Sequence, residues 1–184
     1  ALVSNDIEVD SLATEAEGLI VLDETPFYAE SGGQVGDLGR ISWSGGEFQV
    51  TDVRYLAHKV IAHFGRVVSG APKLGDSVEC VVDSNNRSAT AANHSATHLL
   101  HSALREVLGD HVQQKGSMVN AERLRFDFSH GEAVSSADID KIEQIVNQQI
   151  RINSGVNTRV MNIDDAREEG AAALFGERYE DDVR

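Results

Sequence analysis

Two histidines, His94 and His98, stand four residues apart in a segment whose pattern predicts a helix. Four residues advance an α-helix by about 400°, so the second imidazole lies one turn above the first and about 40° around the axis. This spacing lets one helix supply two ligands to a zinc ion. Ser95 stands where metalloproteases of the His-Glu-x-x-His type carry a glutamate as general base, which disfavours a metal-dependent protease.

The histidine pair alone leaves three interpretations open: a metal site, a catalytic pair or helix packing. Zinc takes three or four ligands in proteins, and the third histidine on this helical face is His101. By helical rise its Cα lies about 10 Å from that of His94, which is long for sharing one ion. We therefore expect His101 to pack against or support the site, and the metal site remains incomplete in this stretch.

Polar and glycine residues elsewhere are candidates for the same cleft. Thr97 lies about 60° from His94 around the helix, so its hydroxyl either faces the cleft or bonds back to a carbonyl one turn earlier. Gln114 follows the helix and precedes a strand candidate, where an amide faces either a cleft or solvent. The glycines of Gly32-Gly33-Gln34 permit positive φ, which suits either a ligand approaching the backbone or a plain turn.

The first 85 residues have a β pattern. Short apolar or alternating segments are separated by turn residues, and the pair Gly45-Gly46 between two of them indicates a hairpin. We predict a small β-barrel subdomain over residues 1–85, with the Gly-Gly-Gln loop inside it. The predicted strands are 19–22, 40–43, 47–53, 58–64 and 77–82.

From residue 86 the pattern becomes mixed. A helix is predicted at 87–108, with strands at 116–119 and 124–128. A second helix follows the capping residues Ser135 to Asp138, then a strand at 158–161 and a last helix from 164 through Leu174 that ends at Gly176. The inner face of the first helix is predicted to hold Ala92, Ala96, Leu99, Ala103, Leu104 and Val107, and that of the second Ile139, Ile142, Val146 and Ile150. The predicted fold class is α+β: the β-barrel subdomain, then an α+β core over 86–184 with the His-bearing helix packed on an antiparallel sheet.

Composition limits the classes of partner. The net charge of −14 opposes tight nonspecific binding to nucleic acid, although a local basic patch remains possible. Lys115, Arg123 and Arg125 are the densest basic group near the histidines, and solvated surface cations are the favoured interpretation. Cys80 is the only cysteine and no apolar run spans a bilayer, so we expect a cytoplasmic protein without a membrane partner.

Several segments, in order along the chain, together resemble the editing region of alanyl-tRNA synthetases. Freestanding editing proteins of the same superfamily share much of this pattern. Threonyl-tRNA synthetases share only the His-helix domain and lack a counterpart of the Gly-Gly-Gln loop. The segments that carry the resemblance are 23–37, 93–101, 111–117, 124–130 and 173–179.

The resemblance implies hydrolysis of tRNA(Ala) wrongly charged with serine or glycine, in a cleft between the barrel and the core. It implies a parent alanine–tRNA ligase that binds ATP, with the tRNA(Ala) acceptor end and the parent's other domains as partners. By motif match the zinc ligands are His94 and His98, the residues that reject alanine and shape the amino-acid pocket are Thr97 and Gln114, and the residues that place the acceptor end are Gly32, Gly33 and Gln34.

The family takes its remaining zinc ligands from a Cys-Gly-Gly-Thr-His segment that follows the position of Arg184, and the printed sequence does not contain it. Cys80, in a strand of the other subdomain, is a poor substitute. We therefore expect zinc in the intact parent and weak or absent zinc, with low activity, in this chain alone. Two alternatives stay open: a freestanding trans-editing hydrolase, and a module that docks the acceptor stem without activity.

Overall fold

The computed structural model describes residues 1–57, 60–171 and 181–183, and its chain forms two compact units. The first unit holds residues 1–102 and 114–128, and the second holds residues 103–113 and the described residues from 129 onward. The division predicted at residue 85 rests on sequence pattern and stays a prediction. The elements are β1 Leu2–Ser4, β2 Ile7–Val9, β3 Glu17–Val21, β4 Gly39–Trp43, β5 Gly46–Tyr55, β6 Ile61–Ser69, β7 Glu79–Val82, α1 Ser84–Leu108, β8 Gln114–Val119, β9 Leu124–Phe128, α2 Ser136–Ile152, β10 Met161–Asn162, α3 Ile163–Glu168 and β11 Asp182–Val183.

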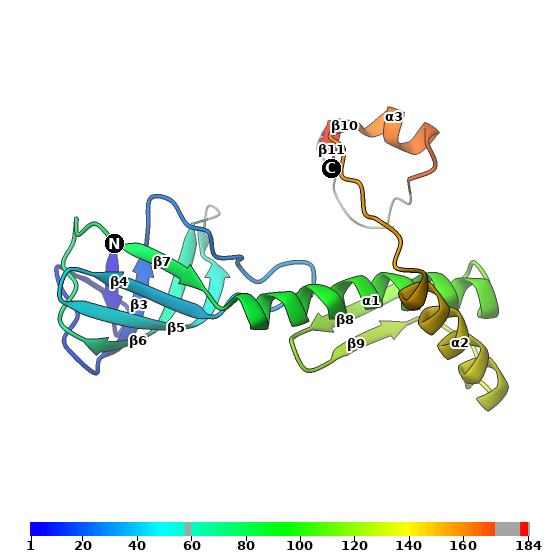
Figure 1. Cartoon of the computed structure of the whole chain (residues 1–184), viewed down its shortest axis with the longest axis horizontal. Helices are drawn as coiled ribbons and strands as arrows, with labels where there is room; N and C mark the ends of the chain where they lie inside the picture. The colour runs from blue at the N-terminus through cyan, green and yellow to red at the C-terminus, as the bar shows by residue number, and fades with distance from the viewer. Residues whose placement is uncertain (58–59, 172–180, 184) are drawn as a thin grey trace. The chain divides into compact units, whose positions relative to one another are not determined.

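The first unit is built on a seven-stranded sheet in the order β2-β1-β3-β6-β5-β4-β7 (Figure 1), and every neighbouring pair is antiparallel. Its core lies on one face of these strands, where Ile41, Phe48, Val50 and Val53 are fully buried. The predicted α+β class is confirmed in its coarse form, since the structure combines a large antiparallel sheet with a few helices. A closed barrel also requires pairing between the end strands β2 and β7, and the described strands pair only in the open order.

Helix α1 begins at Ser84, three residues before the predicted start, because Asp83 caps it. The Asp83 carboxylate accepts a hydrogen bond from the Asn86 N–H at 2.9 Å, and its backbone carbonyl accepts the Arg87 N–H. The Asp83 N–H in turn donates to the Leu38 carbonyl at 2.8 Å. The start of the helix is therefore fixed to the segment that leads into β4.

The buried face of α1 differs from the predicted apolar stripe in its first half. Ala92 is exposed, whereas Thr90 and Thr97 are 3% and 5% exposed. Thr97 donates its hydroxyl to the Asn93 carbonyl at 2.9 Å, so its only polar hydrogen is satisfied within the helix. A threonine bonded in this way packs much like an apolar residue, which a hydrophobicity pattern does not register.

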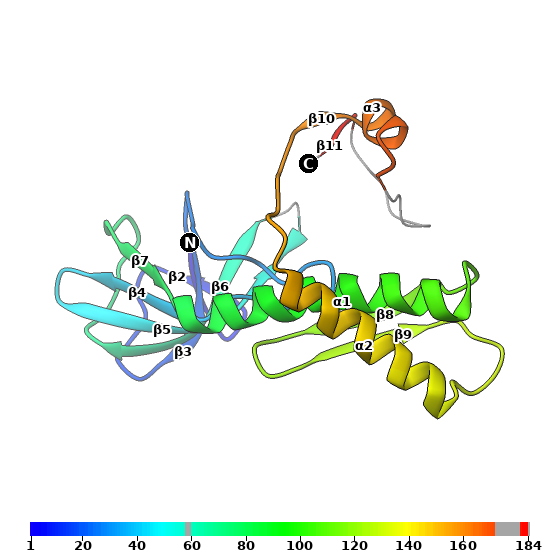
Figure 2. The same ribbon diagram turned by 45° about the vertical axis from the view of Figure 1, so that its right-hand side comes forward.

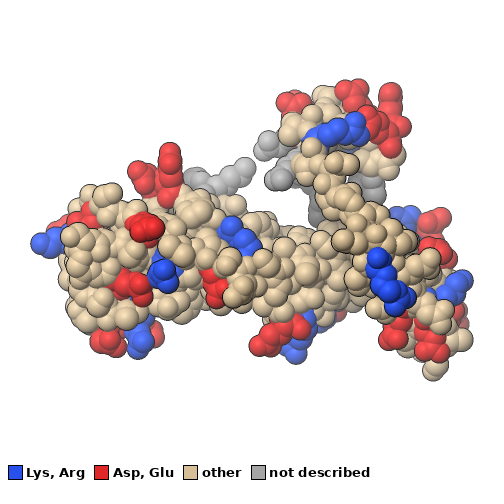
Figure 3. All heavy atoms as spheres, in the orientation of Figure 1, with Lys and Arg blue, Asp and Glu red and all other residues tan. Residues whose placement is uncertain are grey.

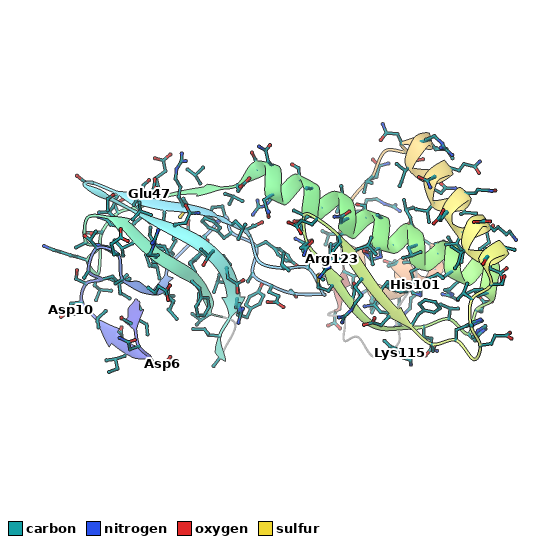
Figure 4. The ribbon with its side chains drawn as sticks, turned by 90° about the horizontal axis from the view of Figure 1, so that it is seen from below. Asp6, Asp10, Glu47, His101, Lys115 and Arg123 are labelled. Atoms are coloured by element: carbon teal, nitrogen blue, oxygen red, sulfur yellow. The ribbon has the colours of Figure 1, made fainter. Side chains whose placement is uncertain are left out.

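The hairpin β8–β9 lies alongside α1 in both Figure 1 and Figure 2. Asn93 donates its side-chain amide to the Asn120 carbonyl in the hairpin turn at 2.8 Å. Two turns further along α1, the ring of His101 lies 5.0 Å from that of Phe126 (Figure 4). The expectation that His101 packs beside the pair agrees with this contact, and the hairpin supports the helical segment that carries His94 and His98.

In the second unit, α2 begins after Ser135 as predicted, and the Ser135 hydroxyl accepts the Asp138 N–H at 3.2 Å. Its predicted inner face is only partly correct. Ile142 is 5% exposed, but Ile139 and Ile150 are 45% and 52% exposed. Within the described residues of this unit, α2 is buried only around Ile142.

The C-terminal elements are shorter than predicted. The strand predicted at 158–161 is reduced to β10, which pairs with β11, and α3 stops at Glu168 because Gly170 adopts φ +89. The predicted helix end at Leu174 and Gly176, like the segment 173–179, lies outside the described residues. In the described part of the chain, no helix is both long and apolar enough to span a membrane.

Candidate functional site

The rings of His94 and His98 stack on one face of α1. Their ring centroids are 5.1 Å apart and their planes are inclined by 15°. His98 is exposed and His94 is half-buried. Burial lowers the pKa of His94 below its ordinary value, and the neighbouring charge of His98 lowers it further. His94 therefore stays neutral, with one free lone pair, to a lower pH than an imidazole in water.

The Gly-Gly-Gln loop supplies a direct partner for this pair. The side-chain oxygen of Gln34 lies 2.7 Å from Nδ1 of His94, although the residues are 60 positions apart in the chain. An amide oxygen only accepts hydrogen bonds, so Nδ1 of the neutral ring carries the proton. The free lone pair of His94 is then on Nε2, the atom available to a metal ion or a water.

The loop is held against β8 through its backbone. The Val119 N–H donates to the Gly33 carbonyl at 2.8 Å, and the Val35 N–H donates to the Val119 carbonyl at 3.0 Å. A Cβ placed on Gly33 would lie 2.7 Å from the Ser117 carbonyl oxygen, so this glycine meets the hairpin backbone. Gly32 has φ +58 and open space around it, so the side available for a ligand is at Gly32.

An ion pair that the sequence analysis missed braces the base of the loop. Asp37 is 4% exposed and accepts hydrogen bonds from the Tyr28 N–H at 2.6 Å and from two nitrogens of Arg87. Arg87 also donates to the Pro26 carbonyl at 2.8 Å, and its hydrogen bond to Asp37 raises its pKa. Arg87 belongs to α1, so these contacts tie the loop to the histidine helix. Asp37 and Arg87 are 50 positions apart, so no local sequence pattern indicates that they pair.

Two predicted site residues have other surroundings. The Thr97 hydroxyl bonds back to Asn93, which was one of its two predicted alternatives. Gln114 is exposed and opens β8 opposite Phe128. It stands five residues, or about 17 Å of extended strand, from Val119, where the loop is attached. The structure thus brings together His94, His98 and Gln34, while the roles of Thr97 and Gln114 stay predictions.

The donors present match zinc in kind but not in number. A neutral imidazole whose other nitrogen donates to a carbonyl oxygen is the usual state of a zinc-bound histidine. Zinc needs at least three protein ligands, and within the residues that the structure describes no group of three or more His, Cys, Asp or Glu side chains could hold a metal ion. Cys80 is free and lies in β7, paired with Ile41. His94 and His98 would therefore supply two of the ligands that a zinc ion requires, and their role as zinc ligands stays a prediction.

The predicted basic group does not form a patch. Arg125 makes an exposed ion pair with Asp127 at 3.1 Å. Lys115 lies beside the open end of the hairpin and Arg123 at its turn, and both are labelled in Figure 4. Figure 3 shows Lys and Arg interspersed with Asp and Glu across the described residues of the face drawn.

A second pair of histidines comes together in the other unit, which sequence reasoning did not anticipate. Nε2 of His111 and Nδ1 of His130 are 2.9 Å apart, and the rings stack at 5.2 Å. The Ser129 hydroxyl donates to the His111 carbonyl at 3.2 Å. These contacts hold the segment after α1 to the segment after β9, which gives the pair a structural role.

Comparisons with known proteins place these features in context. A family model described as class II tRNA synthetases (A) matches residues 1–86. The alanine–tRNA ligase of Saccharophagus degradans is 53% identical over 184 residues, which is 100% of this chain and 21% of that protein. The alanine–tRNA ligase of Rhodopseudomonas palustris is likewise 53% identical over 184 residues, with the same coverage of 100% and 21%.

The chain is similar along its whole length to one stretch of alanine–tRNA ligase. It spans about a fifth of the length of the curated relatives it matches. The resemblance to alanyl-tRNA synthetases predicted from the motifs agrees with this similarity, which extends over all 184 residues.

Proposed function

We propose that this chain is the editing part of an alanine–tRNA ligase and hydrolyses the ester that joins serine or glycine to tRNA(Ala). The observation that carries the proposal is the contact between Gln34 and Nδ1 of His94, which leaves the Nε2 lone pair free on a ring that stacks on His98. The whole-chain similarity to alanine–tRNA ligases supplies the substrate class. The parent's ATP-dependent ligation of alanine, its other domains and a cytoplasmic location belong to the same proposal.

Ester hydrolysis requires a water positioned for attack and stabilisation of the negative charge that develops on the carbonyl oxygen. His94 contributes a neutral ring with a free Nε2, because burial lowers its pKa. Gly32 is exposed and has open space around it, so its backbone is accessible to the acceptor end of a tRNA. The loop and the helix thus offer a polar, weakly charged surface to the ester.

Zinc is the expected cofactor of this site. His94 and His98 would hold the ion together with ligands from outside the described residues. When bound, zinc acts as a Lewis acid that polarises a water or a carbonyl oxygen. The two imidazoles alone predict weak retention of the metal.

Selectivity for serine over alanine depends on one hydroxyl group. An apolar pocket that binds alanine rejects an added hydroxyl poorly, which makes a second hydrolytic site useful. The Thr97 hydroxyl donates to Asn93 and keeps its oxygen lone pairs as acceptors. We propose that this acceptor recognises the hydroxyl of serine, which alanine lacks, and that Gln114 shapes the amino-acid pocket.

The test is deacylation of Ser-tRNA(Ala) by the complete gene product, with zinc present, for three proteins. His98→Ala removes an exposed imidazole and should slow deacylation more than tenfold. Ser102→Ala, an exposed change on the same helix, is the matched control and should stay within twofold of the unchanged protein. Full deacylation by His98→Ala would reject the proposed site.

One alternative is favoured by a particular observation. The described residues offer only two metal ligands, which suits a module that docks the acceptor stem while chemistry occurs elsewhere. In that case tRNA(Ala) would bind and Ser-tRNA(Ala) would remain intact with and without zinc. A freestanding trans-editing hydrolase would show the same deacylation without alanine ligation.

A further inference from the structure

We propose that Gln34 is a positioning residue that fixes the tautomer and orientation of His94. The loop that carries Gln34 was predicted to place the tRNA acceptor end. The contact with His94 gives the glutamine a different task, which acts through the histidine and precedes any contact with tRNA. The biological meaning of this task rests on the proposed function, but the task itself is measurable without tRNA.

The contact with Gln34 determines which nitrogen of His94 carries the proton. A neutral imidazole has one N–H and one lone pair, and a free imidazole side chain prefers the proton on Nε2. The oxygen of Gln34 at 2.7 Å from Nδ1 reverses this preference, since only a protonated Nδ1 can donate to it. Loss of this oxygen would return protons to Nε2 and occupy the lone pair that is otherwise free for a ligand.

Several hydrogen bonds hold the backbone around Gln34 in place. Its own backbone forms a tight turn with Ser31 through reciprocal hydrogen bonds of 2.9 and 3.1 Å. The Tyr28 hydroxyl donates to the Ser31 carbonyl at 3.1 Å, which closes the turn from the other side. The residue pairs with Val119 of β8 as a parallel bridge. A side chain that starts from so fixed a backbone can hold a ring in one orientation.

Orientation matters because His94 stacks on His98. The ring planes are inclined by only 15°, so a rotation of the His94 ring would disrupt its stacking on His98. Gln34 approaches His94 from the loop while His98 lies one turn along the helix. The ring is therefore held between a hydrogen bond and a stacking contact, as is typical of histidines whose second nitrogen serves a ligand.

The test is ¹⁵N–¹H correlation spectroscopy of the chain labelled at histidine, without added metal and at a pH where His94 is neutral. The chain with Gln34 should show His94 protonated at Nδ1. Gln34→Leu removes the acceptor and should produce a substantial Nε2–H population. Gln34→Glu retains an oxygen acceptor and should keep the proton on Nδ1. Gln148→Leu, an exposed change on α2, is the control and should match the unchanged chain.

Two results would overturn the proposal: an Nε2–H tautomer in the unchanged chain, or the same Nδ1–H tautomer in Gln34→Leu. If Gln34→Leu does not fold, the tautomers of the unchanged chain and of Gln34→Glu decide the matter. Failure of deacylation with an intact Nδ1–H tautomer would reject the proposed function and leave the positioning role in place.

Kinetics separate positioning from tRNA contact in a protein that deacylates Ser-tRNA(Ala). A positioning role predicts that Gln34→Leu lowers kcat about tenfold or more with KM changed less than twofold, with recovery in Gln34→Glu. A rise in KM at constant kcat would assign Gln34 to tRNA binding instead and contradict the proposal.

Discussion

Alanine substitutions at the two neighbouring glycines of the loop should have unequal effects. Gly32 and Gly33 have φ of +58 and +83, a region that residues with a Cβ adopt at a cost of about 1–2 kcal/mol. A Cβ on Gly32 meets nothing within 4 Å, whereas one on Gly33 lies 2.7 Å from the Ser117 carbonyl oxygen and 2.9 Å from its Cβ. Gly32→Ala therefore carries only the conformational cost.

Gly33→Ala must also move away from β8, because both close contacts are shorter than real Cβ contacts. That movement breaks the hydrogen bonds between Val119 and the backbone of Gly33 and Val35, at 2.8 and 3.0 Å. Each such bond contributes about 1 kcal/mol. We expect Gly33→Ala to lose about 3–4 kcal/mol of unfolding free energy, against about 1–2 kcal/mol for Gly32→Ala.

The assay is urea unfolding of both variants, with the His94 tautomer measured on the same samples. Movement of the loop carries Gln34 with it, so Gly33→Ala should also lose the Nδ1–H signal of His94 while Gly32→Ala keeps it. Equal stability losses in the two variants, or an unchanged His94 signal in Gly33→Ala, would show that close packing of the loop on β8 does not hold Gln34 in place.

Three further outcomes are expected. Asp37→Asn should lower the free energy of unfolding by about 1.5–3 kcal/mol, because it removes the charge from a carboxylate that accepts hydrogen bonds from Arg87 and a backbone N–H. An unchanged midpoint in urea unfolding would contradict a stabilising role for this ion pair. Burial lowers the pKa of His63 in the folded state, so the stability that its neutral ring contributes is complete above about pH 6.5 and is lost as the pH falls below that value towards the folded pKa. Between pH 7.5 and 5 the unfolding free energy should therefore decline less in His63→Gln than in the unchanged chain. Parallel curves for the two proteins would contradict this expectation. Gln114→Ala in the complete gene product should slow Ser-tRNA(Ala) deacylation with little effect on alanine ligation, and an unchanged deacylation rate would reject its predicted role.

Zinc content gives one more expectation for the chain alone. Because two imidazoles are half of a zinc site, dialysed protein should hold far less than one zinc per chain by elemental analysis. Stoichiometric, tightly held zinc would show that ligands outside the described residues complete the site.

Local signals predicted much of the fold. The Ser135 cap, the strands on either side of the Gly45-Gly46 turn and the helix that carries His94 and His98 all depend on residues within a few positions of one another. The errors have local physical causes too. Asp83 caps α1 earlier than the pattern suggested, and Gly170 stops α3 early through its positive φ.

The spacing of residues along the sequence could not predict which site residues come into contact. Gln34 and His94 are 60 residues apart, and Asp37 and Arg87 are 50 apart, so only the folded sheet and helix bring them together. The local sequence around a glutamine in a glycine-rich loop does not indicate whether its side chain contacts a ligand or a histidine. The motif resemblance predicted Gln34 as a site residue, and the structure shows that its side chain contacts His94.

The proposed function of the chain is the removal of a wrong amino acid from tRNA(Ala). The most direct measurement compares the first-order deacylation rates of Ser-tRNA(Ala), Gly-tRNA(Ala) and Ala-tRNA(Ala) with the complete gene product and zinc, each against the spontaneous rate. The account predicts that the serine and glycine esters are hydrolysed far faster than the alanine ester. Spontaneous rates for all three esters, or equal acceleration of all three, would contradict it.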